Sequence, residues 1–479
     1  MLNKDDARHI IDLNPYKTID EEIAERQFEV IIKAYNHLSQ ENNNFIYIAD
    51  EVGLGKTYVA LGIASLLRRF CKEERRSIYK DVILVPKQNL QHKWIKEINN
   101  FVNNNYISEC NIVKSVLGKP VGNCSLSNIH HQLELFSISN PSYEVFRNSS
   151  FSIATSGEAK DWQQKLHDLV PENLKSIFSQ GRKLFGRKEE NFIYLKRLYA
   201  YLLNISFPEI DLLIVDEAHN FKHGVGEGVA IRNQIVSRLM GTISEDDKLH
   251  IFSQIPELNI ELIKPKAKKV IFLSATPIDN GLHEIKQQFD CFLPNHKFSK
   301  SEAVSVEIKN SLSSFMIRGL MNITLPNEQD NNGKVSRNMY RHEHRRGNVE
   351  KSIDAKPQYI KDDLETIILG MMQYKTLKHF DESNNKNFEI GMLAAFETFN
   401  PKTQNDQEYE ETSNRTTIKS ADQGVVQKIA NSYFENFKTH LPHPKQDNMV
   451  EILFNGFKNR TKSLVFVRRI ASVVELERK

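Results

Sequence analysis

A glycine-containing segment between a short apolar run and a helical stretch constrains the fold more than any other feature of this 479-residue chain. The apolar run ends at Ala49, residues 50–55 form the segment, and Lys56 and Thr57 open a stretch that reads as a helix through Phe70. In such a strand–loop–helix order, backbone N–H groups can surround phosphate oxygens, and the helix start adds partial positive charge. The pattern predicts a phosphate-binding loop on a parallel α/β sheet.

The first three hundred residues alternate short β-branched runs with helical stretches, which is typical of a parallel sheet covered by helices. The candidate strands are residues 45–49, 81–86, 111–117, 151–155, 211–216 and 269–274. The last two are nearly continuous apolar runs, as expected of strands buried on both faces. Helical periodicity in residues 157–208 predicts a helical insertion into this sheet domain.

The chain is expected to contain three regions. The sheet domain, with its insertion, covers residues 1–298, and helical stretches take over in residues 299–441 as a helical insertion or linker region. A predicted helix at residues 447–457 and an apolar strand at residues 462–467 follow a Pro-containing break. Residues 442–479 therefore read as the beginning of a second sheet domain.

The predicted loop carries groups suited to ATP and Mg²⁺. Gly53, Leu54 and Gly55 would line the phosphates, Lys56 would pair with the β- and γ-phosphates, and the Thr57 hydroxyl would bind Mg²⁺. The general pattern of such loops has glycine at the position of Asp50, so this residue is a departure. The alternative interpretation is an ordinary glycine-containing turn capped by a threonine.

A pair of carboxylates follows the strand at residues 211–216. Asp216 would hold Mg²⁺, usually through water, and Glu217 would orient and deprotonate the attacking water. In an open parallel sheet, ligands bind at the carboxyl ends of the strands, where both residues are placed. A charged helix start, where carboxylates are favoured anyway, is the alternative. Together with the phosphate loop, the pair predicts an ATP-hydrolysing site.

A third predicted strand ends in Ser274-Ala275-Thr276-Pro277. The hydroxyl groups of Ser274 and Thr276 could bond to His219 or to the carboxylates and so relay the state of the γ-phosphate. The alternative is a simple turn at the end of a strand.

These motifs, taken in order, resemble those of superfamily-two helicases, and in detail they are similar to the Swi/Snf-type branch of double-stranded DNA translocases. That branch carries aspartate at the position of Asp50 and has the Asp-Glu-Ala-His sequence found here at residues 216–219. The resemblance continues through residues 82–86 with Trp94 and through residues 274–285. It implies a RecA-like parallel sheet with helices on both faces, a mainly helical region and the start of a second RecA-like lobe.

Other parts of the resemblance are looser. Residues 315–318 are similar to a Phe-Met-Leu-Arg segment of the family, with Gly319 where a second arginine is usual, and residues 443–466 look like the entry into the second lobe. The third motif reads Ser-Ala-Thr where many eukaryotic members have Thr-Gly-Thr. A bacterial or archaeal member is therefore implied.

The resemblance also assigns two binding roles. Gln27, on a predicted helix at residues 21–38, matches the glutamine that reads adenine, although a solvated helix residue is the alternative. Thr155 matches a threonine that touches the nucleic-acid backbone.

Two basic clusters stand out from a formal net charge of only +3. One contains Arg341, Arg345 and Arg346, and the other consists of Arg182, Lys183, Arg187 and Lys188. Such runs are usually solvated faces. They could contact nucleic-acid phosphates only if they line the same groove as the motor site.

The resemblance implies an ATP-dependent motor that tracks double-stranded DNA. We find no arginine-finger motifs before Lys479, so we expect this chain to bind Mg-ATP and hydrolyse it slowly. The expected protein partner is one that supplies the second lobe, or a defence or restriction complex. Two alternatives stay open: a nucleotide-gated binding or regulatory module without motor activity, and an RNA helicase.

Composition indicates the compartment. No run of about 18 apolar residues occurs, so no membrane partner is expected. The cysteines, Cys71, Cys110, Cys124 and Cys291, are widely scattered. They indicate reduced thiols in a cytoplasmic protein.

Overall fold

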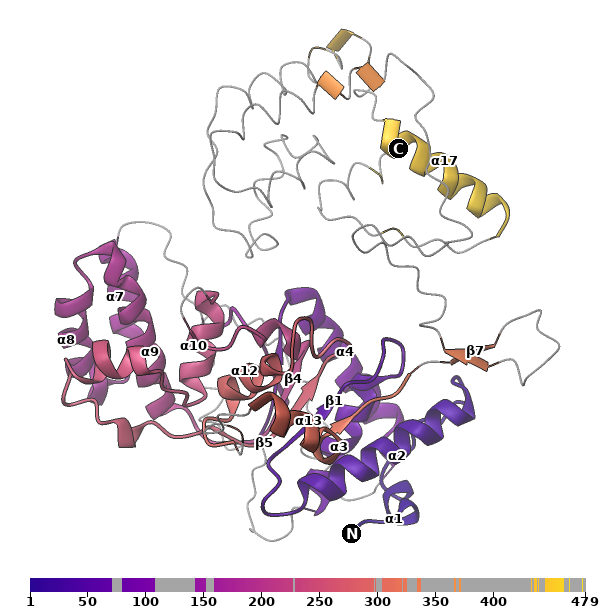
Figure 1. Ribbon diagram of the computed structural model, residues 1–479, viewed down its shortest axis with the longest axis horizontal. Coiled ribbons are helices and arrows are strands. Elements are labelled where there is room, and N and C mark those ends of the chain that lie inside the picture. The colour runs from indigo at the N-terminus through magenta and orange to yellow at the C-terminus, as the bar shows by residue number, and fades with distance from the viewer. Residues whose placement is uncertain are drawn as a thin grey trace. The chain divides into compact units, whose positions relative to one another are not determined.

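The computed structural model describes residues 1–70, 80–107, 143–151, 159–226, 229–296, 298 and 304–320, together with shorter stretches beyond them, the longest of which is 444–460. The chain divides into two compact units, Met1–His342 and Glu343–Lys479. The second unit contributes one long described helix, α17 (Pro444–Lys458). The first unit contains the central sheet (Figure 1).

A six-stranded sheet, parallel in every described pairing, forms the centre of the first unit. Its strands lie in the order β3-β2-β4-β5-β1-β6. In chain order they are β1 (Phe45–Ile48), β2 (Asp81–Val85), β3 (Tyr143–Arg147), β4 (Ile210–Asp216), β5 (Ala267–Leu273) and β6 (Met316–Ile317). A separate antiparallel pair joins β7 (Asn322–Thr324) to β8 (Lys334–Ser336).

Helices flank the sheet and extend away from one side of it (Figure 1). In chain order they are α1 (Lys4–Arg8), α2 (Glu21–Leu38), α3 (Lys56–Phe70), α4 (Gln88–Asn104), α7 (Ala159–Leu169), α8 (Lys175–Phe185), α9 (Phe192–Ser206), α10 (Ile231–Leu239), α11 (Glu245–Asp247), α12 (His283–Phe292) and α13 (Val304–Phe315). The start of α2 is fixed by Asp20, whose side chain accepts a hydrogen bond from the Glu22 N–H. Such a cap satisfies one of the backbone donors left over at a helix start.

The order of the strands decides which face each helix covers. The connections from β1 to β2 and from β2 to β3 run toward one edge of the sheet, whereas those from β4 to β5 and from β5 to β6 run toward the other. Because crossovers between parallel strands are right-handed, α3 and α4 cover one face, and α10 and α12 cover the opposite face. The chain leaves the neighbouring strands β1 and β5 toward opposite faces, which opens a ligand crevice at their carboxyl ends.

The parallel α/β sheet predicted from the sequence is confirmed, and two of its strands come from unexpected places. Phe151, at the start of a predicted strand, lies in a turn, and the edge strand β3 is formed eight residues earlier. Its sequence, Tyr-Glu-Val-Phe-Arg, mixes charged and apolar residues too briefly to give a clear two-residue period. The two-residue strand β6 arises in the segment expected to be helical. The strand predicted at residues 111–117 lies outside the described residues.

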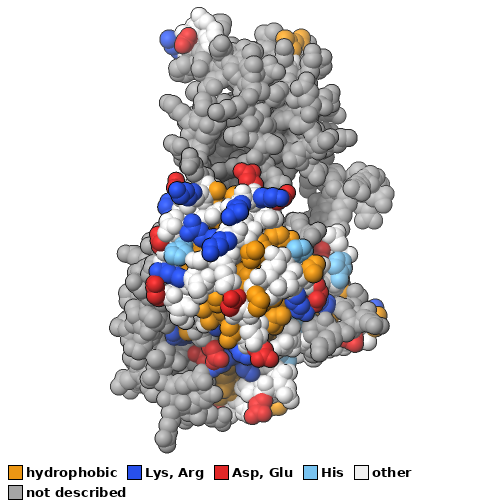
Figure 2. Space-filling model, turned by 90° about the vertical axis from the view of Figure 1, so that its left-hand side faces the viewer, with side chains coloured by type: hydrophobic (Ala, Val, Ile, Leu, Met, Phe, Trp, Pro, Cys, Tyr) orange, Lys and Arg blue, Asp and Glu red, His pale blue; other side chains and the backbone are white. Residues whose placement is uncertain are grey.

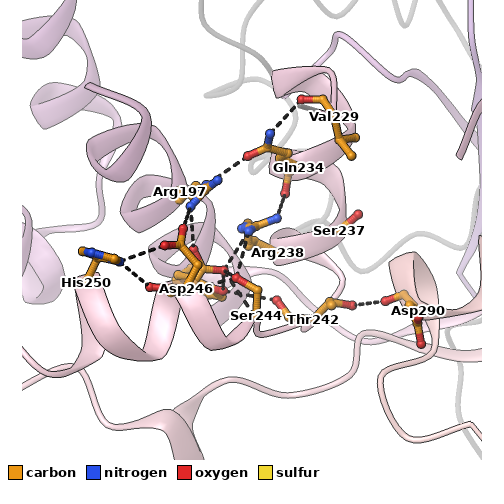
Figure 3. Close-up of polar contacts among 12 residues, drawn as sticks. Arg197, Val229, Gln234, Ser237, Arg238, Thr242, Ser244, Asp246, His250 and Asp290 are labelled. Atoms are coloured by element: carbon orange, nitrogen blue, oxygen red, sulfur yellow. Dashed lines mark hydrogen bonds and ion pairs between the residues drawn. The ribbon is translucent and has the colours of Figure 1, made fainter. Parts of the chain in front are cut away.

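Buried charges fasten α9 to the sheet domain. This helix occupies the predicted insertion together with α7 and α8. The fully buried Asp247 carboxylate of α11 lies 2.8 Å from Arg238 Nη2 of α10 and 3.3 Å from Arg197 Nη1 of α9. Figure 3 shows Arg197 between Asp246 and Gln234, whose Oε1 accepts from Arg197 Nε at 2.9 Å. Because each buried charge faces an opposite charge or a hydrogen-bonding group, the desolvation cost of the network is offset.

The described helices include none with both the length and the apolar character needed to span a bilayer.

Candidate nucleotide-binding site

Three sequence motifs follow three neighbouring strands of the sheet. Leu273, the last residue of β5, pairs with Ile48 of β1 on one side and with Asp216 of β4 on the other. Because adjacent strands lie about 4.8 Å apart, these three strand ends occupy a row roughly 10 Å wide. The phosphate loop, the carboxylate pair and the Ser274 turn therefore meet at one edge, as their order along the sequence predicted.

Glycine is required at two positions of the phosphate loop. Gly53 and Gly55 have φ values of 95° and 77°, in the left-handed region that side chains disfavour. A Cβ atom on Gly55 would also lie 2.2 Å from Nε2 of Gln27. That amide donates to the carbonyl of the buried Leu54 at 3.1 Å. Gln27, the predicted adenine reader, is thus buried on α2 and held directly against the loop.

Asp50 forms the base of the loop and is fully buried. Its carboxylate accepts hydrogen bonds from Arg26 Nη2 at 2.7 Å, from Arg26 Nη1 at 3.3 Å and from the Gly319 N–H at 2.6 Å. A Cβ atom on Gly319 would lie 1.6 Å from Arg26 Nη2, so the missing side chain makes room for the guanidinium. The residue that departs from the general loop pattern therefore joins the loop to α2 and to the segment after β6.

Lys56 is turned back onto its own loop. Its Nζ atom donates to the carbonyl of Asp50 at 2.8 Å and to that of Glu51 at 3.3 Å. Burial lowers the pKa of Lys56, and nearby carboxylates, that of Glu217 first, act in the opposite direction. The half-buried Thr57 follows in the first turn of α3. The ammonium group is therefore placed among carbonyl oxygens that phosphate oxygens could replace.

Asp216 is oriented by a residue whose role the sequence did not reveal. Its Oδ2 atom accepts the indole N–H of Trp94 at 2.7 Å, and its Oδ1 atom accepts the backbone N–H of Glu217 at 3.0 Å. Burial raises the pKa of Asp216, and the two hydrogen bonds oppose this. Trp94 lies on α4 and is only 1% exposed, so the carboxylate is held by a rigid group.

Glu217 has a strained backbone. Its φ and ψ are both 50°, a left-handed conformation that costs a non-glycine residue about 1–3 kcal/mol and that clusters at functional sites. Asn220 supports this conformation because its Nδ2 atom donates to the Glu217 carbonyl at 2.8 Å. Burial raises the pKa of Glu217, and the neighbouring Asp216 carboxylate raises it further. The side chain thus has the character of a base whose pKa is shifted toward neutrality.

A chain of contacts runs from Glu217 to the third motif. His219 Nδ1 lies 3.3 Å from Glu217 Oε2 and 2.9 Å from Ser274 Oγ. The Ser274 Oγ atom also accepts the backbone N–H of the exposed Thr276 at 3.2 Å. The structure therefore brings the predicted coupling residues together in one continuous path.

Four predicted nucleic-acid contacts, Thr155, Arg341, Arg345 and Arg346, lie outside the described residues. Two residues that shape the site were not assigned a role from the sequence, namely Arg26 and Trp94. Trp94 was part of the family resemblance without an assigned role, and it also lies on an apolar helix face with Ile98 and Phe101, all buried in α4. That face by itself indicates packing and does not indicate a carboxylate partner.

The oxygen donors at the site fit Mg²⁺. This ion is usually bound by one or two protein oxygen ligands together with substrate phosphates and water. Thr57 and Asp216 are oxygen donors at the ends of α3 and β4 that face the crevice. The described residues contain no cluster of three or more His, Cys, Asp or Glu side chains that would form an all-protein metal cage.

Comparison with known proteins gives one family match. The family model described as type III restriction enzyme, res subunit, matches residues 20–279. No curated protein matches the chain.

Two solved structures illustrate the similarity. The DEAD-box helicase Mss116, bound to ssRNA and UDP-BeF, is 15% identical with a TM-score of 0.29 over 61% of this chain and 44% of that chain. The Sulfolobus solfataricus SWI2/SNF2 ATPase core in complex with dsDNA is 13% identical with a TM-score of 0.31 over 89% of this chain and 67% of that chain. The chain thus spans less than half the length of the Mss116 chain.

Proposed function

We propose a function on one premise: the chain belongs to the family described as type III restriction enzyme, res subunit. It contains an ATPase motor domain of the helicase type. In our proposal this domain is the ATP-binding lobe of a nucleic-acid-dependent motor, most specifically a double-stranded DNA translocase of the Swi/Snf branch. The observation that carries the proposal is the common row formed by Ile48, Leu273 and Asp216.

The phosphate loop binds and orients the substrate in this proposal. The N–H groups of Gly53–Gly55 and the start of α3 face the phosphates of ATP. Lys56 exchanges the carbonyls of Asp50 and Glu51 for the β- and γ-phosphate oxygens. Thr57 and Asp216 would hold Mg²⁺, which would supply charge neutralisation at the phosphates.

Glu217 acts as the base. Its carboxylate orients the attacking water and accepts a proton from it as the bond to the γ-phosphorus forms, while the bond from the γ-phosphorus to the bridging oxygen breaks and ADP leaves. His219 then links this carboxylate to Ser274 and Thr276, so a change in charge at Glu217 reaches the end of β5. We propose that this path couples hydrolysis to the grip on nucleic acid.

The Swi/Snf assignment rests on Asp50. An aspartate at this position distinguishes that branch. Here its carboxylate accepts three hydrogen bonds, two from Arg26 and one from the Gly319 N–H. We also propose residues 1–298 as the first lobe with its insertion at residues 157–208, residues 299–441 as a helical linker region and residues 442–479 as the start of a second lobe. A restriction or defence complex is proposed as the setting from the family description.

The nucleic-acid partner is tested by the rate of ATP hydrolysis. We expect duplex DNA to raise the rate more than single-stranded DNA or RNA of the same length and phosphate concentration, because tracking along a duplex requires contacts to its backbone. The measurement is steady-state phosphate release with each polymer in turn. Stimulation by RNA alone would identify an RNA motor, and equal rates with and without every polymer would identify a nucleotide-gated module.

A further inference from the structure

One end of the helical insertion lies at the same edge of the sheet as the nucleotide site. Trp162 of α7, Phe192 of α9 and Ile231 of α10 line one cavity of about 390 Å³. From α10, the Asn233 Nδ2 atom donates to the carbonyl of Asn220 at 2.8 Å, and Asn220 in turn holds Glu217. Two hydrogen bonds therefore connect the start of α10, beside this cavity, to the proposed base.

The end of α8 lies beside the start of α7 at this place. Arg182 Nη1 donates to Gln164 Oε1 at 3.1 Å, and Gln163 Nε2 donates to the Gly186 carbonyl at 2.8 Å. These two contacts bring together the basic residues of the two helices, which are Lys160, Lys165, Arg182, Lys183, Arg187 and Lys188. We call these six residues the basic surface.

Most cations of the basic surface are exposed and have no acidic partner. Within the described part of the chain, no ion pair joins Lys160, Lys183 or Arg187 to a carboxylate. Residues 159–196 contain eight Lys and Arg against five Asp and Glu. Two of the five acids, Asp168 and Glu172, lie at the opposite end of the helix pair. Asp161, Glu189 and Glu190 lie at this end, and Glu190 pairs with Lys188 at 3.7 Å.

Figure 2 looks onto this side of the molecule and shows Lys and Arg side chains gathered toward the upper part of the described surface. The start of α10 adds to the positive potential. Ala230, the residue before α10, makes no side-chain cap, so backbone N–H groups at that helix start keep their partial positive charge.

We infer that the basic surface binds the phosphate backbone of the nucleic acid on which the motor acts. Long, exposed and unpaired cations suit phosphates, whose contacts are independent of base sequence. The surface lies toward the same edge of the sheet as the nucleotide site, to which α10 is linked through Asn220. The inference rests on the proposed function, from which it takes double-stranded DNA as the polymer.

A triple variant tests the inference. Lys160→Gln, Lys183→Gln and Arg187→Gln together should weaken binding of a labelled DNA duplex at least about tenfold at 0.1 M salt. The slope of log Kd against log salt should fall by about 0.9 for every duplex phosphate contact that is lost. Fluorescence anisotropy of the full chain without nucleotide measures both quantities, with single-stranded DNA and RNA as further probes. Unchanged affinity for a fluorescent ATP analogue shows that the variant is folded.

The matched control removes the same charge elsewhere. Lys33→Gln, Lys264→Gln and Lys309→Gln replace three exposed lysines on other parts of the first unit. Equal affinity losses in the two triple variants, or a wild-type chain that binds ATP but no nucleic acid, would overturn the inference. If the two triple variants differ only in their affinity for RNA, the result supports the basic surface as a nucleic-acid site and contradicts duplex DNA as its ligand. If the wild-type chain binds duplex DNA through this surface but does not hydrolyse ATP, the proposed motor function is contradicted and the inferred binding surface is not.

Discussion

Glu217→Gln is expected to lower the rate of ATP hydrolysis by about 10²–10⁴-fold while ATP still binds. The amide keeps the size of the side chain and its contact with His219, but it cannot accept a proton from the attacking water. ATP contacts the phosphate loop, which this substitution leaves untouched. Phosphate release and binding of a fluorescent ATP analogue, measured on the same preparation, separate the two effects.

Glu209→Gln is the matched control. It makes the same chemical change just before β4, at the amino end of the strand whose carboxyl end precedes Glu217, where the side chain is 63% exposed. This variant should hydrolyse ATP at the wild-type rate. Normal hydrolysis by Glu217→Gln would remove Glu217 from the role of base.

The pH dependence of hydrolysis has a predicted sign. A general base works only when ionised, so the rate falls as the pH drops through its pKa. Because burial raises the pKa of Glu217 above the ordinary glutamate value, this fall should occur at a higher pH than a solvated glutamate would give. The adjacent Asp216 carboxylate contributes in the same direction.

Asp247→Ala is expected to lower the free energy of unfolding of the first unit by about 3–5 kcal/mol. The substitution leaves Arg238, whose side chain is 1% exposed, without its buried counter-charge, and it also removes the nearer of two acceptors of the Tyr201 hydroxyl. Urea denaturation followed by tryptophan fluorescence measures the change, since both tryptophans, Trp94 and Trp162, lie in the first unit.

Glu245→Ala is the control for this network. Glu245 is two residues away in the same helical turn, and its side chain is 88% exposed. Exposed ion pairs contribute little, so its unfolding free energy should change by less than about 1 kcal/mol. Similar losses in both variants would mean that the buried charges do not fasten the insertion to the sheet domain.

Local sequence patterns predicted the parts of the site that are contiguous in the chain. The loop before Lys56, the carboxylates after the β4 run and the hydroxyls after the β5 run were each visible as a strand followed by functional groups. The rule that ligands bind at the carboxyl ends of parallel strands then predicted that they would meet. The common row of Ile48, Leu273 and Asp216 agrees with this placement.

The partners of these residues could not be predicted, because they come from distant parts of the chain. Asp50 accepts from Gly319, 269 residues later, and Trp94 donates to Asp216, 122 residues later. Neither pair leaves a periodic signal. The short strand β6 could not be predicted for a similar reason. Two residues are too few to show a period, and the position of β6 in the sheet is set by its pairing with β1.

ATP affinity tests the central claim most directly, because every proposed step begins at the phosphate loop. We predict that the chain binds Mg-ATP and that Lys56→Ala weakens binding roughly ten- to a hundredfold, the loss expected for hydrogen bonds to a charged group. Isothermal titration with Lys33→Ala, an exposed lysine on α2, provides the control for charge. Equal affinities of wild type and Lys56→Ala, or no binding by the wild-type chain, would contradict the assignment of this loop as the nucleotide site.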